Sequence, residues 1–330
     1  MSFQIIKNSL NIIAFLGLSS LISSTASAEP LSIIATNFPQ YDLVKHIVKD
    51  KAQVKMLLKT GAEAHSFEPT PQDLIDISKA SLFVYNGGEN DEWVDNFLEG
   101  TDVKPETFAF TEQVVLREEE SVQGMQEDEH HHHGDEAEEH HDHAHSHADH
   151  DHEEVEFDEH VWTSPKNNIV LIDKLLAKIS SLDPENQEFY KKNAQSYSQE
   201  FSDLDNEFTK LIENAPVKTV IFGDRFPLLY FVKDYGLGYF AAFKGCSNET
   251  EVSASTLKFL IDKAKDTKAK VIFKIELSSS DIADTVAEAA GARVLTFQTG
   301  HNLTVEEFKA GKSLADLYNE DLKVLKEALY

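Results

Sequence analysis

The chain has 330 residues, a formal net charge of −28 and a single cysteine. So negative a charge argues against nucleic acid and anionic lipid as partners, and one cysteine rules out an intramolecular disulfide. After a short leader, about 300 residues are too many for one compact core, which predicts two domains.

Residues 1–28 have the features of a secretory signal peptide. Lys7 precedes an apolar run over 12–22, and Ala26 and Ala28 stand at the −3 and −1 positions before Glu29. The run is too short to span a bilayer. We therefore expect cleavage before Glu29 and a periplasmic mature protein, and we expect no lipid anchor because no cysteine stands at the cleavage site.

Residues 29–182 alternate between strand and helix patterns. Apolar periodicity and turn residues predict strands at 31–36, 53–58 and 82–85 and helices at 40–51, from 70 onward and at 166–181. Such alternation is typical of parallel pairing, so the predicted class is α/β.

An acidic insert at about 118–158 interrupts this first region. Eighteen acids and no Lys or Arg lie between Glu118 and Glu159, so the segment carries −18 of the −28, and eleven of the 15 histidines lie between His130 and His152. With almost no apolar residues, the segment is expected to be disordered. Its composition is also that of a weak, multidentate metal-binding tract.

Residues 183–214 predict one long helix. Tyr197, Phe201, Leu204, Phe208 and Leu211 recur at three- and four-residue spacing. About 30 residues at 1.5 Å per residue would span about 45 Å, a length suited to bridging two domains. Residues 215–330 repeat the α/β pattern, with strands at 217–222, 239–242, 271–275 and 294–297 and helices at 227–235, 253–266, 279–290 and 312–329. The predicted architecture is therefore two similar α/β lobes joined by a bridging helix.

Four histidines lie outside the insert. His65, His160 and His301 fall in loops, where open α/β sheets bind ligands at the carboxyl ends of their strands. His46 lies in a helical pattern and is interpreted as a partly exposed helix residue. His65 and His160 have carboxylate neighbours, including Glu63 and Asp158, which are suited to orient a ligating imidazole.

A family resemblance rests on several motifs in order. They are His65 through Pro71, the Tyr85-Asn86-Gly87-Gly88 strand end, the acidic His-rich insert, His160-Val161-Trp162 followed by Pro165, and the terminal helix. Together they resemble the zinc- and manganese-binding solute receptors of ABC importers, the cluster A-I family, above all its zinc-uptake receptors. The resemblance covers nearly the whole mature chain. It implies metal bound in a cleft between two lobes.

The resemblance also implies four ligands drawn from both lobes. His65 and His160 match the first two positions, and His301 stands where the family commonly has an acid. The third position usually holds a histidine or glutamate after the first strand of the second lobe. No histidine occurs there, so Asp224 is the candidate, next to the non-ligating cation Arg225. Three imidazoles and a carboxylate suit tetrahedral Zn²⁺.

The expected function is an extracytoplasmic protein, monomeric and not an enzyme, that captures zinc and delivers it to the permease of an ABC importer. Three alternatives stay open. A manganese receptor of the same fold would prefer oxygen ligands. A zinc hydrolase would need a general base, and the HExxH motif is absent. A zinc buffer or surface adhesin would rely on the insert. Cys246 is expected to have no part in tight binding.

Overall fold

The computed structural model describes residues 30–101, 104–126, 156–245, 247 and 251–330. The chain from Leu31 to Tyr330 clusters as one compact unit. The predicted signal peptide, most of the acidic insert and Cys246 lie outside the described residues. Among the described helices, none has the length and apolar character needed to cross a membrane.

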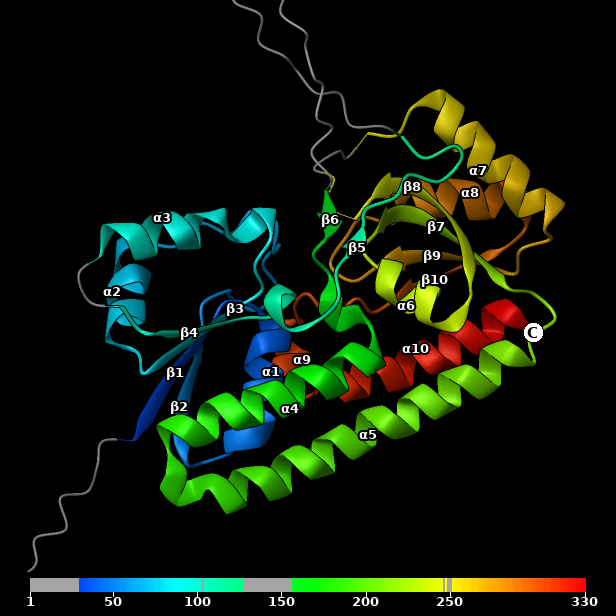
Figure 1. The fold of residues 1–330 in the computed structure, drawn as a ribbon. Helices are drawn as coiled ribbons and strands as arrows, with labels where there is room; N and C mark the ends of the chain where they lie inside the picture. Colours follow the sequence, from blue (N-terminus) through cyan, green and yellow to red (C-terminus); the bar gives the residue numbers. More distant parts are fainter. Residues whose placement is uncertain (1–29, 102–103, 127–155, 246, 248–250) are drawn as a thin grey trace, which may run out of the picture. The chain divides into compact units, whose positions relative to one another are not determined.

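The first half forms a four-stranded parallel sheet in the order β2-β1-β3-β4 (Figure 1). Side chains alternate between the two faces of a strand. Ile33 therefore packs in the large core with α1, while its neighbour Ile34 packs in a smaller core with α2 and α3. Both faces are buried, as parallel sheets require. The elements are β1 (Leu31–Ala35), α1 (Phe38–Val48), β2 (Ala52–Met56), α2 (Pro71–Lys79), β3 (Leu82–Tyr85), α3 (Glu92–Gly100) and β4 (Glu106–Ala109).

The second half repeats this build in the order β10-β9-β7-β8, again parallel. Ile221 and Ile272 face α7 and α8 in a separate core, whereas Phe222 and Phe273 join the large core. The elements are β7 (Thr219–Phe226), α6 (Leu229–Tyr235), β8 (Gly238–Lys244), α7 (Ala254–Asp266), β9 (Val271–Ile275), α8 (Asp281–Ala290), β10 (Arg293–Phe297), α9 (Val305–Lys309) and α10 (Leu314–Leu329).

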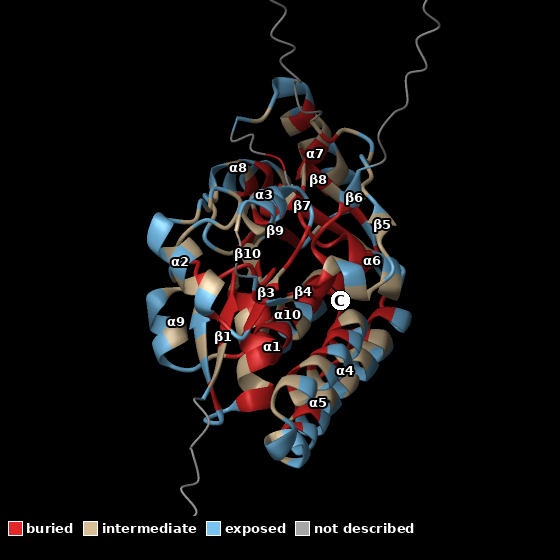
Figure 2. Ribbon diagram, turned by 60° about the vertical axis from the view of Figure 1, so that its left-hand side comes forward, coloured by how far each residue is buried: buried red, intermediate tan, exposed pale blue. Residues whose placement is uncertain are grey.

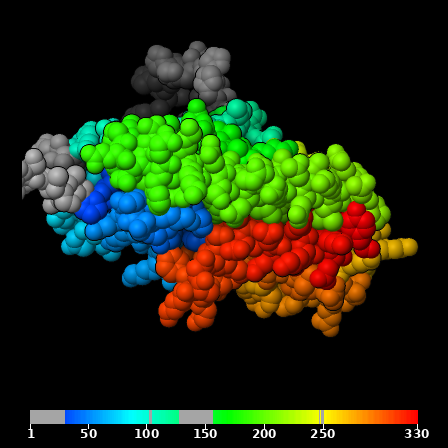
Figure 3. Space-filling view, turned by 90° about the horizontal axis from the view of Figure 1, so that it is seen from below, coloured from blue at the N-terminus to red at the C-terminus, as the bar shows by residue number. Residues whose placement is uncertain are grey.

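The long helix α5 (Gln187–Glu213) runs beside both halves. Its 27 residues would span about 40 Å, and it packs against α1, α10 and the preceding helix α4 (Pro165–Leu182). Tyr190, Tyr197, Phe201 and Phe208 form its buried stripe. Figure 3 shows this helical layer, in green, lying alongside the blue N-terminal and red C-terminal segments. Buried residues concentrate along the strands and on the inner faces of α1 and α10, whereas α2 and α9 expose much of their surface (Figure 2).

A two-stranded antiparallel ladder joins the two flanks of the insert. β5 (Arg117–Glu118) pairs with β6 (Phe157–Asp158), which places Arg117 opposite Asp158. Directly after β6, a short 3-10 turn, Val161–Thr163, leads into α4. The ladder therefore fixes the chain just before His160.

Candidate metal centre

Three histidines from separate loops converge on one point. His65 follows β2, His160 precedes the turn at Val161, and His301 follows β10. Each offers a ring nitrogen, and these atoms all lie within 4.8 Å of one another. The Nε2 atoms of His65 and His160 are 3.4 Å apart. The three predicted imidazole ligands thus form one cluster.

Two of the imidazoles are oriented by a carboxylate two residues earlier in the chain. His65 Nδ1 lies 2.9 Å from Glu63 Oε1, and His160 Nδ1 lies 3.1 Å from Asp158 Oδ1. An ionised carboxylate only accepts hydrogen bonds, so each Nδ1 carries the proton and donates it. In the neutral imidazole, Nε2 then carries the lone pair and is directed at the cluster, as a metal ligand requires.

His301 is oriented by a longer relay. The Thr299 hydroxyl donates to Glu276 Oε1 at 2.6 Å, so its oxygen is left to accept from His301 Nδ1 at 2.5 Å. His301 Nε2 is then unprotonated, and it is buried without a hydrogen-bond partner among the described residues. Burial first, then the nearby His160 and His65, hold the pKa of His301 well below its usual 6.5. His301 therefore stays neutral and available for metal.

The three loops are tied to one another. Asn302 Nδ2 donates to the carbonyls of Lys59 and Ala62, at 2.8 and 2.9 Å, and so joins the His301 and His65 loops. Trp162 Nε1 donates to the Thr299 carbonyl at 3.0 Å and joins the His160 turn to the His301 loop. These bonds position the imidazoles before any ion arrives, which lowers the ordering cost of binding.

The spacing of the cluster suits zinc. Two nitrogens bound tetrahedrally at about 2.05 Å from one zinc ion lie about 3.3 Å apart. The His65–His160 separation of 3.4 Å is close to this value. A cation bound by both lone pairs would hold the two nitrogens at this separation. The arrangement can therefore hold a borderline-soft divalent ion that accepts imidazole.

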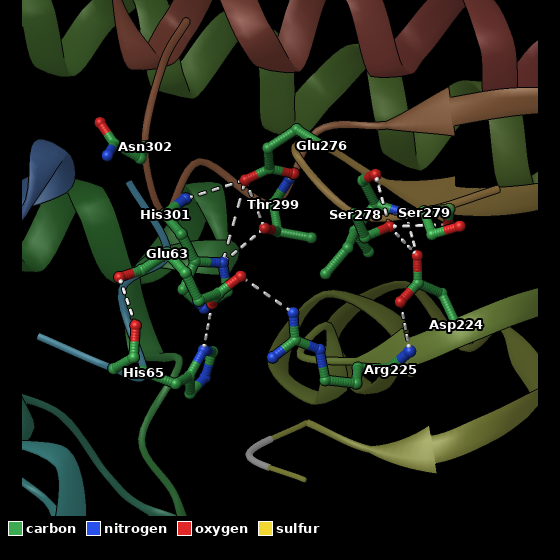
Figure 4. A network of polar contacts seen from close by, with 12 residues as sticks. Glu63, His65, Asp224, Arg225, Glu276, Ser278, Ser279, Thr299, His301 and Asn302 are labelled. Atoms are coloured by element: carbon green, nitrogen blue, oxygen red, sulfur yellow. Dashed lines mark hydrogen bonds and ion pairs between the residues drawn. The ribbon is translucent and has the colours of Figure 1, made fainter. Parts of the chain in front are cut away.

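The structure gives the predicted ligand Asp224 a different role. Its carboxylate accepts hydrogen bonds from the Ile275 amide at 3.0 Å, from the Arg225 amide at 2.8 Å and from the Ser278 hydroxyl. Consecutive side chains of a strand point in opposite directions, and β7 continues through both Asp224 and Arg225. Figure 4 shows Asp224 directed at Ser278 and Arg225 directed at Glu63. Asp224 thus fixes the turn after β9 and lies apart from the three histidines.

Arg225 adds a cation beside the cluster. Its guanidinium lies 3.1 Å from Glu63 Oε2. The hydrogen bond from His65 and the proximity of Arg225 lower the pKa of Glu63 to about 2, against the opposing effect of burial. Glu63 is therefore ionised at neutral pH and links His65 to β7.

Sequence reasoning missed Glu276 and Thr299. Glu276 directly follows β9, at the carboxyl edge where ligand-binding residues collect. That rule selected the histidine loops and would also have selected Glu276. The contact between Glu276 and Thr299 crosses neighbouring strands, so no short motif announces it. His46 lies where the sequence predicted it, in the helix α1, half-buried and bonded to the Asp42 carbonyl, and it is not part of the cluster.

Comparisons with known proteins find a matching family and related sequences. The family described as "Zinc-uptake complex component A periplasmic" matches residues 33–328. The high-affinity zinc uptake system protein ZnuA of Bacillus subtilis is 32% identical over 312 residues, which is 93% of this chain and 90% of the relative. The zinc-binding lipoprotein AdcA of Streptococcus pneumoniae is 30% identical over 298 residues, and this chain spans about half of its length, 55%.

Solved structures are similar as well. The metal-dependent lipoprotein YcdH of Bacillus subtilis superposes with a TM-score of 0.72 at 30% identity, covering 91% of this chain and 99% of that one. The Zn(II)-bound ZnuA-like domain of Streptococcus pneumoniae AdcA gives a TM-score of 0.71 at 27% identity, covering 91% and 98%. The two-lobe α/β architecture predicted for this chain is therefore confirmed.

Proposed function

The chain belongs to this zinc-uptake family, and from that premise we propose that it is a zinc receptor that delivers its ion to the membrane permease of an ABC importer. One observation carries the proposal: three imidazoles, each with its Nδ1 held by an acceptor, direct their ring nitrogens at a common point. We assign His65, His160 and His301 as zinc ligands. Asp224 is not assigned, since its carboxylate is engaged elsewhere.

Delivery follows from where the ligands lie. His65 follows a strand of the first sheet and His301 a strand of the second. An ion bound to both would hold the two halves together, and its release would free them to shift. We propose lobes at 29–182 and 215–330 with a bridging helix at 183–214, supported by the packing of α5 against both α1 and α10. The permease would recognise the zinc-loaded arrangement.

A receptor role is favoured over hydrolysis. A zinc hydrolase needs a general base beside the metal-bound water. The carboxylates nearest the cluster are already used: Glu63 by His65 and Arg225, and Glu276 by Thr299 and the His301 amide. We therefore propose a monomeric receptor without enzymatic activity. Peptidase or esterase turnover by the zinc-loaded chain would contradict this assignment.

The manganese alternative has less support because the cluster offers only imidazole nitrogen, whereas Mn²⁺ favours oxygen ligands. The zinc-buffer alternative depends on the insert and would bind several ions weakly. The periplasm is the proposed location. Absence of a lipid anchor stays a prediction, and fractionation of cells expressing the full chain checks it.

Competition titration with a chromophoric chelator tests the proposal. Wild type is expected to bind one zinc ion tightly. His65→Ala, His160→Ala and His301→Ala should each weaken that site by at least about tenfold, because loss of even an outer partner costs this much. His46→Ala is the matched control, since His46 lies outside the cluster, and should leave the tight site unchanged. Wild-type affinity in all three cluster variants would refute the proposal.

A further inference from the structure

A cavity adjoins the candidate metal centre. It has a volume of about 350 Å³, and its wall includes His65, Glu63 and Arg225 at one end and Ser278, Ser279 and Asp281 at the other. Known sites for small organic ligands start at roughly this volume. Because His65 is both a wall residue and a proposed ligand, a molecule in the cavity would lie beside the bound ion.

The described residues give zinc three ligands, whereas zinc in closed protein sites is four-coordinate. Among these residues, only the three histidines group as a metal-binding set. The neighbouring carboxylates of Glu63, Asp158 and Glu276 each accept hydrogen bonds that orient a ligand or its partner. The described residues therefore offer three ligands, and a water molecule or a bound small molecule can take the fourth position.

Arg225 favours an anion as that donor, because its guanidinium places a positive charge in the wall of the cavity beside His65 and Glu63. The Arg225 side chain is only 15% exposed, and its Nη2 contacts Glu63 at 3.1 Å. A guanidinium has five N–H donors in a planar fork, so it can hold a second carboxylate while it keeps Glu63. Arg225 stands on the cavity wall in the position to do so.

The far end of the cavity limits the anion. Ser278, Ser279 and Asp281 line this end, and Asp224 lies beside them (Figure 4). The carboxylates of Asp224 and Asp281 would repel a second negative charge on the ligand. They would accept a hydrogen bond from an ammonium or hydroxyl group. A monocarboxylate carrying such a group matches both ends.

We propose that the receptor binds zinc together with a small amino acid, whose carboxylate supplies the fourth zinc ligand and pairs with Arg225. This inference rests on the proposed zinc function. It assigns Arg225 as the residue that selects a carboxylate and the Ser278–Ser279 end as the pocket for the rest of the ligand.

Equilibrium dialysis of the full-length chain with radiolabelled L-serine tests the proposal. The zinc-loaded protein should retain about one serine per zinc, and the zinc-free protein none. L-serinamide, which lacks the carboxylate, should not displace the label. Arg225→Met should lower the serine affinity of the zinc-loaded protein at least tenfold, because the guanidinium that pairs with the carboxylate is removed. Arg293→Met is the control, since it removes the same charge at the surface, where Arg293 pairs with Glu327.

A second variant, Ser279→Leu, fills the cavity without touching a proposed ligand and should also exclude serine while it keeps zinc. If the zinc-loaded wild type retained no serine in the dialysis, this inference would be overturned and the zinc function would stand. The inference would equally be overturned if serine bound only after deletion of 127–155, since the insert would then supply the fourth ligand. Failure of wild type to bind zinc at all would instead refute the proposed function.

Discussion

The histidines contributed by the two halves of the molecule are held in different ways. His65 and His160 each use a carboxylate two residues earlier, Glu63 and Asp158, so the ligand and its partner lie in one loop. His301 uses the Thr299 hydroxyl and, through it, Glu276 on a neighbouring strand. The first arrangement places an anion directly on the imidazole, whereas the second places a neutral group between them. A direct anion increases ligand basicity more, so the two arrangements should respond differently to mutation.

The largest effect is expected from the local pair at His160. Asp158→Asn keeps an oxygen that can accept from Nδ1 but removes the negative charge from a buried site. Zinc affinity should fall by about 10–100-fold. Asp205→Asn is the control, because Asp205 accepts from Tyr235 away from the cluster. Competition titration measures both, and an unchanged affinity in Asp158→Asn would show that the anion does not support His160.

The difference between a partner in the same loop and a partner on another strand also explains which site residues the sequence could predict. A carboxylate two residues before a histidine is visible in the printed chain, and Glu63 and Asp158 were interpreted correctly as partners. The alternation of strands and helices likewise predicted the α/β class, because apolar runs such as Ile33-Ile34, buried on both faces of the sheet, can be recognised from the local residue types. Three of the four expected ligands converge in the structure.

What the sequence could not predict depends on contacts between distant strands. Asp224 was chosen by its place after a predicted strand at 217–222, but β7 continues to Phe226 with an irregularity between Phe222 and Arg225. That extension sends Asp224 toward Ser278 and Arg225 toward Glu63. Glu276 was missed because its role depends on Thr299, which follows the adjacent strand β10.

The second prediction changes the ligand of the second half itself. His301→Asp replaces a neutral imidazole with an anionic oxygen donor, which suits Mn²⁺ better and Zn²⁺ less well. The zinc-over-manganese preference should shrink by about tenfold, the scale of losing one well-oriented ligand interaction. The natural affinity order would still favour zinc. Competition titrations with both metals measure the ratio, and an unchanged ratio would show that His301 is not a ligand.

A smaller effect is expected from the relay behind His301. Thr299→Val removes the oxygen that accepts from Nδ1 and leaves the side-chain volume similar. Zinc affinity should fall by about tenfold, at the lower end for partners of metal-binding histidines. Thr299→Ser restores the hydroxyl and should recover most of the affinity. Equal losses in the two variants would indicate a packing role for Thr299 and not a relay.

The last prediction concerns the stability of the protein and not its metal binding. Burial raises the pKa of Asp91 from 3.8 to about 6, while its Oδ2 accepts from the amides of Asn86 and Gly87 at the end of β3. Between about pH 4 and pH 6 the unfolded chain loses this proton and the folded chain keeps it. The folded state therefore binds more protons than the unfolded state in that window. The protein's free energy of unfolding should then decrease as the pH rises through it.

Asp91→Asn isolates this contribution, because the amide oxygen still accepts from both backbone groups but does not titrate. The difference in unfolding free energy between wild type and Asp91→Asn should change by on the order of 2 kcal/mol from pH 4 to pH 7, at 1.36 kcal/mol per pKa unit. Wild type should lose stability relative to the variant as pH rises. Urea unfolding of zinc-free protein at each pH measures the difference without a contribution from metal binding. A difference that does not vary with pH would mean that Asp91 titrates alike in the folded and unfolded states, and that burial at this edge of the first sheet does not disfavour its charge.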